Sequence, residues 1–280
     1  MRKVIINADD FGLNKSVNKA IIDTYKMGNL SSTTLMVNMP GTQDAVELAK
    51  ENPNLGIGLH FCITEGKPLT NATTLITESG EFISRGKLVK DVMKGKIDLN
   101  EVKSEFQAQL ELIKSYGLNF THVDSHQHTM MIPQIFKSIV PILNENKINV
   151  RLVKPYDFDL KLLMKRPKKF ILQGINTIFA NKNAKQSYVK SNDYLTSVHE
   201  LDHINSFNSA SYIELLEKAP GAGIVELMVH PYILDEALKK WYGNKLNTKM
   251  PFISICEKEY KCLTEKPLFL DYKLLTFKDI

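Results

Sequence analysis

Four short apolar runs in the chain each end in side chains that bind metal ions or transfer protons in enzymes. The residues at these ends are Asp9 and Asp10, His60, His126 and His128, and His230. Apolar runs of this length predict parallel strands buried on both faces, and active sites of α/β folds gather at the carboxyl ends of such strands. We therefore expect these carboxylates and imidazoles to form one site, and the protein to be an enzyme.

The inventory of side chains is that of a metal-dependent hydrolase. One Asp and two His can bind a metal ion with a coordination position left open, which is typical of catalytic sites, whereas structural zinc sites are closed by four ligands. The remaining Asp and His are then available as base and acid. Two imidazoles with one carboxylate favour Zn²⁺ over Mg²⁺, which prefers oxygen ligands. Cys62 has no thiol partner nearby and is expected to be a small buried residue.

The segment that contains His126 has two interpretations. His122, Asp124, His126 and His128 alternate along the chain, so they share one face if the strand continues. If the strand ends near Asp124, the last two histidines lie in a loop instead. The Asp pair of the first run also has a structural alternative, because an Asp that follows a strand can simply accept backbone hydrogen bonds in a turn.

Two charged residues interrupt apolar strands and require partners. Glu226 shares a strand face with His230, and a buried Glu is stable only when it is paired. Arg151 within Val150–Val153 predicts an anionic partner inside the fold, which is either the substrate or a carboxylate of the site. We expect Arg151, Glu226 and Asp124 to bind substrate or to support the catalytic groups.

The elements that position these residues alternate between strand and helix. Strands are expected at 4–8, 32–37, 55–60, 121–125, 149–154 and 224–229, and helices at 14–26, 42–51, 100–116, 133–146, 212–218 and 254–263. This alternation predicts a parallel sheet in one α/β domain over residues 1–280, a (β/α)-barrel-like fold or distorted TIM-type barrel. An open doubly wound sheet is the alternative. Residues 61–85 are expected to form a long loop, and 155–195 an irregular basic insertion, while the structure of 236–252 is not predicted.

Composition and charge exclude several classes of protein. With 43% hydrophobic and 24% charged residues the chain is expected to be globular, and its net charge of +5 is mild. No basic, aromatic-rich module predicts nucleic-acid binding. No apolar run is long enough for a membrane span or a signal-peptide core, so we expect no membrane association and a cytoplasmic location. The densest basic stretch, Lys161 to Lys169, lies in the insertion, through which a homodimer is conceivable.

Several spaced motifs resemble the YdjC-like carbohydrate deacetylases, of the chitooligosaccharide deacetylase type. These motifs are Ala8–Gly12, Gly58–Phe61, Gly66–Leu69, His122–His128 and Val229–Pro231. The resemblance implies a barrel-like fold and one divalent metal ion, usually described as magnesium, bound by Asp10, His60 and His126. By analogy with the NodB-type polysaccharide deacetylases, it implies Asp9 as the base and His230 as the acid.

The same resemblance implies the substrate class. The expected substrates are small N-acetylated amino sugars, such as chitobiose derivatives, which lose acetate from the 2-acetamido group. His128 has no ligand role in this set, and we expect it to lie beside the ligands. Trp241 and Tyr242 are candidates for a lid that stacks on a sugar ring.

Two other functions compete with this interpretation. A phosphoesterase would use the same metal ion but more cationic side chains around it, and Arg151 and Lys67 are the obvious candidates in the sequence. A sugar-binding protein without catalytic activity would not need Asp9.

Overall fold

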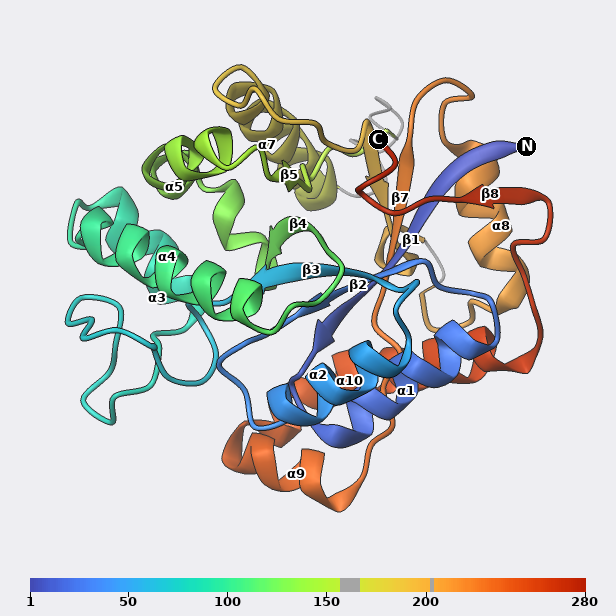
Figure 1. Cartoon of the computed structure of the whole chain (residues 1–280), viewed down its shortest axis with the longest axis horizontal. Helices are drawn as coiled ribbons and strands as arrows, with labels where there is room; N and C mark the ends of the chain where they lie inside the picture. Colours follow the sequence, from blue (N-terminus) through green and yellow to red (C-terminus); the bar gives the residue numbers. More distant parts are fainter. Residues whose placement is uncertain (157–166, 202–203) are drawn as a thin grey trace.

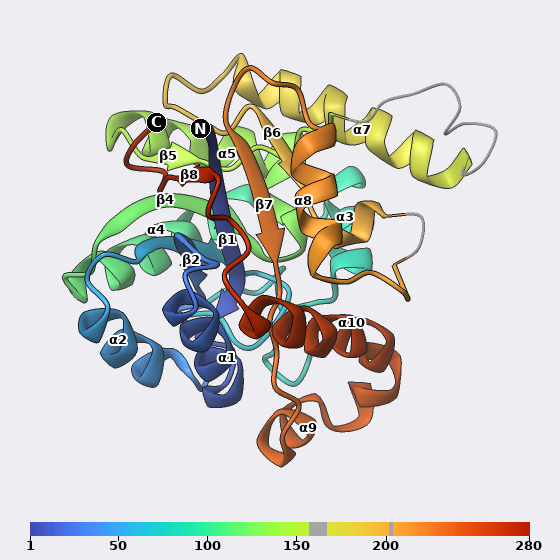
Figure 2. The same cartoon turned by 90° about the vertical axis from the view of Figure 1, so that its right-hand side faces the viewer.

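The strands form the centre of the molecule and the helices surround them (Figures 1 and 2). The computed structural model describes residues 1–156, 167–201 and 204–280. Its strands are β1 (Arg2–Phe11), β2 (Ser32–Leu35), β3 (Gly56–Phe61), β4 (Phe120–Ser125), β5 (Asn149–Val150), β6 (Tyr194–Thr196), β7 (Val225–Val229) and β8 (Tyr272–Leu274). The pairings between these strands are all parallel, in the order β5-β4-β3-β2-β1-β7-β6, and β8 pairs with the start of β1.

Irregular hydrogen bonds join the two edge strands of this sheet. At the end of the short β5, the amide of Val150 donates to the carbonyl of Lys190 at 3.0 Å, and the amide of Leu195 in β6 donates to the carbonyl of Lys154 at 2.9 Å. The side chain of Asn192 fills the space between by bonding the backbone N–H and C=O of Leu152, at 2.8 and 2.9 Å. The strands therefore curve into a distorted barrel, as predicted from the sequence.

The six expected helices are present, with three additions among the described residues. The described helices are α1 (Lys15–Lys26), α2 (Thr42–Glu51), α3 (Arg85–Met93), α4 (Leu99–Ser115), α5 (Pro133–Glu145), α7 (Pro167–Ala184), α8 (Ser209–Lys218), α9 (Glu236–Tyr242) and α10 (Leu246–Glu265). Three short 3₁₀ helices are η1 (His126–Met131), η2 (Val198–Glu200) and η3 (Gly243–Lys245). Local sequence explains several helix starts: Asn14 accepts the amide of Ser16 at the start of α1, and Pro133 occupies the first turn of α5.

The segment expected to be an irregular insertion is partly regular. Within 155–195 it contains the eighteen-residue helix α7 and the beginning of β6. Most of the basic stretch between Lys161 and Lys169 lies outside the described residues, so a dimer contact there stays a prediction. α3 was also not predicted, because its sequence is basic and buries only a few side chains, Leu88 and Val92 among them.

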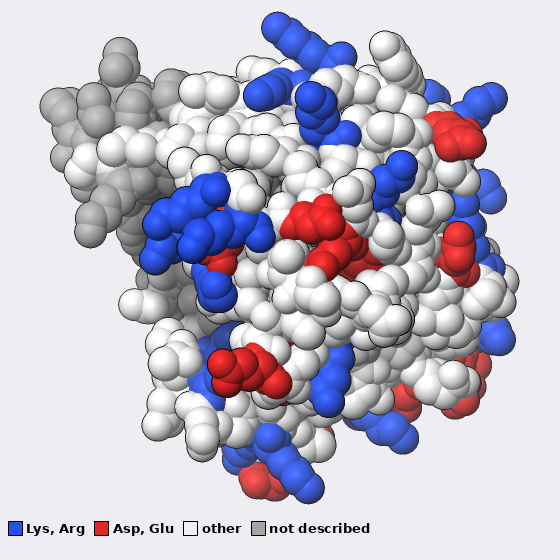
Figure 3. Space-filling view, turned by 90° about the vertical axis from the view of Figure 1, so that its left-hand side faces the viewer, with Lys and Arg blue, Asp and Glu red and all other residues white. Residues whose placement is uncertain are grey.

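The surface carries both signs of charge. On the face shown in Figure 3, Lys and Arg side chains stand in small groups between Asp and Glu side chains. Within the described residues, no helix has the length and apolar character that crossing a bilayer requires.

The long loop after β3 is fixed to α4 by buried carboxylates. Glu105 on α4 is fully buried, and its oxygens accept the amides of Leu69 and Thr70 at 3.0 Å and the Thr70 hydroxyl at 2.6 Å. The amide of Gln109, one turn along the helix, completes the set at 2.8 Å. The loop between β3 and α3 is thereby anchored to α4 at Leu69 and Thr70 by bonds to a charged acceptor, which are stronger than neutral ones.

We expect Glu105→Ala to lower the free energy of unfolding by about 2–4 kcal/mol, because the buried Gln109 and the loop donors Leu69 and Thr70 lose their acceptor. Glu111→Ala, at an exposed position of the same helix, is the matched control and should change it by less than about 0.5 kcal/mol. Urea unfolding followed by circular dichroism measures both values. Equal effects of the two substitutions would contradict the anchoring role of Glu105.

Candidate active site

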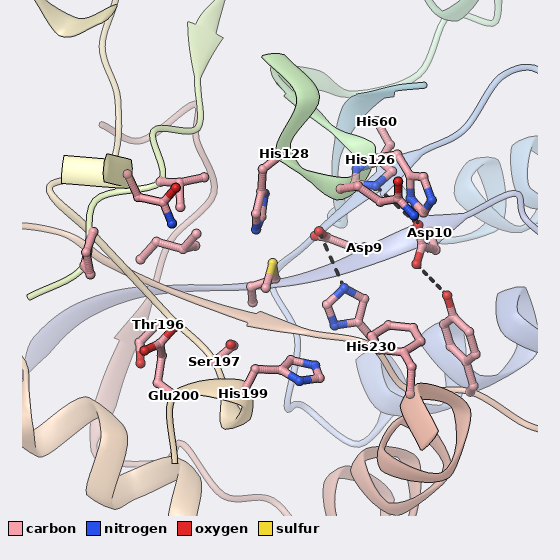
Figure 4. Close-up of a pocket in the computed structure, with 18 of the residues that line it drawn as sticks. Asp9, Asp10, His60, His126, His128, Thr196, Ser197, His199, Glu200 and His230 are labelled. Atoms are coloured by element: carbon pink, nitrogen blue, oxygen red, sulfur yellow. Dashed lines mark hydrogen bonds and ion pairs between the residues drawn. The ribbon is translucent and has the colours of Figure 1, made fainter. Parts of the chain in front are cut away.

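The predicted site residues line one cavity at the carboxyl ends of the strands. The cavity has a volume of about 500 Å³. The predicted residues that line it are Asp9, Asp10, His60, His126, His128 and His230. Figure 4 shows these side chains converging from β1, β3, η1 and the end of β7. The structure therefore brings together all four strand ends that the sequence analysis singled out.

A β-bulge lets both carboxylates of the Asp pair face the cavity. In a regular strand Asp9 and Asp10 would point to opposite sides of the sheet. The register between β1 and β2 shifts between Ala8 and Phe11, and Asp10 has a φ of +67°. Such a bulge re-aims side chains. Gly12 follows with a φ of +92°, and a Cβ there would lie 2.6 Å from the carbonyl oxygen of Met36, so no larger residue fits.

The three predicted metal ligands are neighbours in space. Asp10 Oδ1 lies 3.3 Å from His60 Nε2 and 2.9 Å from His126 Nδ1. The other nitrogen of His126 is buried and has no hydrogen-bond partner. On the far side of His60, Nδ1 lies 2.7 Å from Asp124 Oδ1. A carboxylate behind a ligand imidazole is usual in protein metal sites, since it fixes the ring and its tautomer.

Both the donor atoms and the charges of this cluster fit a divalent cation. Burial alone would raise the pKa of Asp10, but the adjacent His126 and His60 hold it well below its usual value. Burial alone would lower the pKa of His60, but Asp124 and Asp10 raise it to about 10. The carboxylates of Asp10 and Asp124 therefore stabilise a positive charge at the position of His60.

Arg151 joins three carboxylates at the base of the site. Its side chain is 1% exposed. Nη1 and Nη2 bind the two oxygens of Asp9 at 2.8 and 2.7 Å, Nε binds Glu226 at 2.8 Å, and Nη1 lies 2.5 Å from Asp124. The anionic partner expected for Arg151 is therefore a set of site carboxylates. None of Arg151, Asp124 and Glu226 lines the cavity itself.

The carboxylates outnumber this arginine, with consequences for their pKa values. Burial raises the pKa of Asp9, but Arg151, together with His60 and His230, more than offsets this and leaves it lowered. Glu226 receives less compensation, so burial raises its pKa to about 7 despite Arg151. With Asp10 and Asp124 nearby, the site retains more negative charge than one guanidinium neutralises, which again favours binding of a cation.

His230 stands opposite the metal-ligand cluster, next to Asp9. Its Nε2 lies 3.8 Å from Asp9 Oδ2, and its backbone N–H donates to Glu259 Oε2 at 2.9 Å. Burial lowers the pKa of His230, with Asp9 acting in the opposite direction. Glu259 comes from α10, and burial raises its pKa to about 8. Nothing in the sequence pattern of α10 predicted this contact.

The two interpretations of the His126 segment can now be separated. β4 ends at Ser125, and Gln127 and His128 both have positive φ values, so the strand does not continue. His122 is fully buried, stacks on Phe277 at 3.8 Å and does not line the cavity. His128 does line it, and burial together with Arg151 lowers its pKa to about 3. The strand ends as in the second interpretation, but His126 and His128 lie in the 3₁₀ helix η1 instead of a loop.

Several residues of the site were not predicted. Tyr232 donates from its hydroxyl to Asp10 Oδ2 at 2.5 Å. In the sequence, only its position directly after His230–Pro231 could have indicated a role in the site. The hydroxyl of Thr34 on β2 lies 3.1 Å from both Asp124 and His60. This contact depends on the register between β2 and β3, which the sequence does not reveal. Of the two aromatic lid candidates, Tyr242 lines the cavity and Trp241 does not.

Comparison with known proteins identifies the family. The family model for YdjC-like proteins matches residues 3–272. The chain belongs to the YdjC-like protein family. The family resemblance inferred from the motifs is thus confirmed over almost the whole chain.

Curated relatives of this YdjC-like protein carry deacetylase names. The carbohydrate deacetylase of Clostridium beijerinckii is 31% identical over 285 residues, 99% of this chain and 100% of that protein. The chitooligosaccharide deacetylase of Yersinia enterocolitica is 32% identical over 84% of this chain and 83% of its own. A crystal structure of an Enterococcus faecalis V583 protein, named for cellobiose-phosphate cleavage, shares the fold with a TM-score of 0.75. The two sequences are 21% identical, and the superposition covers 99% of this chain and 98% of the Enterococcus faecalis chain.

Arg151→Met should lower the free energy of unfolding by about 3–5 kcal/mol, because three buried carboxylates lose their cation. Arg151→Lys should restore only part of the loss, since an ammonium group cannot bind three carboxylates as the guanidinium does. Urea unfolding at pH 7 measures both. The control is Arg85→Met at an exposed position, with an expected change below about 1 kcal/mol. A similar effect of Arg151→Met and Arg85→Met would contradict the network.

Proposed function

We propose that this YdjC-like protein is a metal-dependent hydrolase that removes the acetyl group from N-acetylated amino sugars, including chito-oligosaccharides. The observation that carries the proposal is the placement of Asp10, His60 and His126 within one cavity beside Asp9 and His230. The names of the curated relatives, carbohydrate deacetylase and chitooligosaccharide deacetylase, support the same chemistry.

Asp10, His60 and His126 would hold the divalent ion. When bound, the ion would polarise the acetamide carbonyl and lower the pKa of a water molecule. Asp124 keeps His60 oriented through Nδ1, and Tyr232 fixes the second oxygen of Asp10. Two nitrogen donors favour Zn²⁺, whereas the family resemblance favours Mg²⁺, so the metal is the variable to measure first.

Asp9 is proposed as the base that accepts the proton of the attacking water. Arg151 binds both of its oxygens and Asn7 donates to one of them at 2.9 Å, so the carboxylate is held in a single orientation. Its lowered pKa keeps it ionised, and therefore able to accept a proton, throughout the neutral range. The orientation compensates for its weak basicity, because a positioned group acts without a further entropic cost.

His230 is proposed as the acid that protonates the leaving amine nitrogen. Its Nε2 is on the side of Asp9, so acid and base act on the same side of the cavity. Burial lowers the pKa of His230 and favours the neutral imidazole, so His230 would take up the proton that Asp9, 3.8 Å away, removes from the water and would pass it to the amine nitrogen. The products are acetate and the free amino sugar, with one water consumed.

The phosphoesterase alternative receives less support from the site. Arg151 is bound to carboxylates and does not line the cavity, and Lys67 is exposed outside it. Lys249 is the one lysine among the described residues that line the cavity, and its Nζ lies 3.5 Å from Glu65 Oε2. A phosphate dianion would meet the carboxylates of Asp9, Asp10 and Glu200 in this cavity.

The purified protein should release acetate from N-acetylated chito-oligosaccharides and no phosphate from sugar phosphates. A chelator should abolish the release, and re-addition of a divalent ion should restore it. Acetate assay together with elemental analysis of protein purified without added metal measures activity and metal identity in the same sample. Phosphate release, or acetate release unaffected by complete metal removal, would refute the proposal.

Two substitutions separate the proposed roles within the site. His230→Ala should lower kcat by about 10²–10⁴-fold with unchanged metal content, because it removes a proton donor and no ligand. Asp10→Asn should lower metal affinity about tenfold or more, because it removes a charged ligand. Isothermal titration with Zn²⁺ and Mg²⁺ and the acetate assay report the two effects separately. Loss of metal in His230→Ala would instead make His230 a ligand.

A further inference from the structure

A second group of side chains that can bind a metal ion lies beside the cavity, apart from the three proposed ligands of the first ion. It consists of His199, His230 and Glu259, whose ligand atoms all lie within 4.8 Å of one another. His199 belongs to η2, His230 directly follows β7, and Glu259 lies on α10. Figure 4 shows the ring of His230 between Asp9 and His199. We call these three residues the second cluster.

Two buried ring nitrogens of the second cluster have no hydrogen-bond partner among the described residues. They are Nε2 of His199 and Nδ1 of His230, and His230 as a whole is only 8% exposed. Nδ1 of His230 lies 3.8 Å from Glu259 Oε2, which is longer than a hydrogen bond. Buried polar atoms are costly unless they are bonded, and imidazole nitrogens are the commonest metal ligands in proteins. The two nitrogens therefore indicate a bound metal ion.

Glu259 supplies negative charge to the second cluster. Its side chain is fully buried. Its oxygens accept the backbone N–H of His230 at 2.9 Å and the hydroxyl of Tyr212 at 3.4 Å, and neither donor carries a charge. No lysine or arginine of the described residues forms an ion pair with it, and burial raises its pKa to about 8. A buried carboxylate is costly without a cation, and a divalent ion would supply one.

The two imidazoles are suited to act as ligands. Burial, with the neighbouring His230, lowers the pKa of His199 to about 4, so the ring is in the neutral form that binds metals. Phe252 contacts both rings, with centroids 5.6 Å from His199 and 5.3 Å from His230. Both histidines line the cavity, which gives an ion access to them. The ligand atoms of tetrahedral zinc lie about 3.4 Å apart, so the cluster would contract slightly around the ion.

We propose that the second cluster binds a second transition-metal ion, such as Zn²⁺, through His199 Nε2, His230 Nδ1 and a carboxylate oxygen of Glu259. Two nitrogen donors select Zn²⁺ over Mg²⁺, which prefers oxygen ligands. The second ion binds more weakly than the first, because Asp10 and Asp124 give the first site more negative charge. The metal content of the protein purified without added metal therefore reports the first site alone.

The second ion inhibits the reaction, a consequence that rests on the proposed deacetylase function. With the ion on Nδ1, the ring proton of neutral His230 is on Nε2. Neither nitrogen then keeps a lone pair for the proton that Asp9 removes from the water, so His230 cannot pass this proton to the amine. Zinc therefore supports the reaction at the first site and opposes it at the second.

The test counts zinc ions in the full-length protein after removal of bound metal with a chelator. Isothermal titration and elemental analysis after dialysis at fixed free Zn²⁺ should show two ions in the wild type, and Mg²⁺ should occupy at most one site. His199→Phe removes a ligand but keeps an aromatic ring against Phe252, and it should bind one zinc ion. Glu259→Gln should weaken the second ion about tenfold or more, because it removes the charged ligand.

Glu257→Gln is the matched control for Glu259→Gln. Glu257 lies on the same helix, two residues away and outside the second cluster, so this variant should keep both zinc ions. Circular dichroism checks the fold of each variant, and His199→Phe and Glu259→Gln each test the site if the other does not fold.

Acetate release at rising free Zn²⁺ tests the inhibition. In the wild type it should rise as the first site fills and then fall at least about fivefold as the second fills. In His199→Phe, expressed relative to its own maximum, this fall should be absent. Release that stays constant while the second ion binds would overturn the inhibition.

The metal count and the activity fail independently. A single zinc ion in the wild type would overturn the second site, and so would a second ion that His199→Phe and Glu259→Gln leave unchanged. Absence of acetate release at every zinc concentration, with a second ion that depends on His199, would refute the deacetylase function and leave the second metal site.

Discussion

The buried guanidinium of Arg151 determines how the ends of the central strands can be arranged. It follows β5 directly, and it binds carboxylates from β1, β4 and β7, so four strands converge on one cation. Removing any of these charges from water is costly, and the cost is offset only when all of them are paired with good geometry. The strand ends are consequently fixed relative to one another. The cavity above them keeps its shape because the charges beneath it cannot separate.

Two departures from regular strand geometry convert this framework into a site. The bulge in β1 directs Asp10 toward His60 and His126 while Asp9 remains on Arg151. The end of β4 at Ser125 is followed directly by His126, which lines the cavity, and then by two residues with positive φ, Gln127 and His128. Backbone conformations of this kind are held only where surrounding structure fixes them, and they concentrate at functional sites.

The sequence was sufficient for the parts of the structure that depend on local pattern. Apolar runs and capping residues predicted the strands and most helices, and the side chains at the strand ends predicted the cavity. What it could not supply is contact between distant segments. Glu259 reaches His230 from a helix near the C-terminus, Thr34 reaches His60 through strand register, and α7 supplies Gln173. No local periodicity encodes such contacts, because they depend on how the elements pack.

The left-handed backbone of Asp10 limits how this site can change over evolution. At a φ of +67°, residues other than Gly, Asn, Asp and His are disfavoured, since the Cβ approaches the following carbonyl. A longer acidic residue would have to accept this conformation as well as a different reach. The repertoire of ligands at this position is therefore restricted by the main chain before metal chemistry is considered. Adaptation of such a centre to another ion is then easier at His60, which lies in a regular strand, than at the bulge.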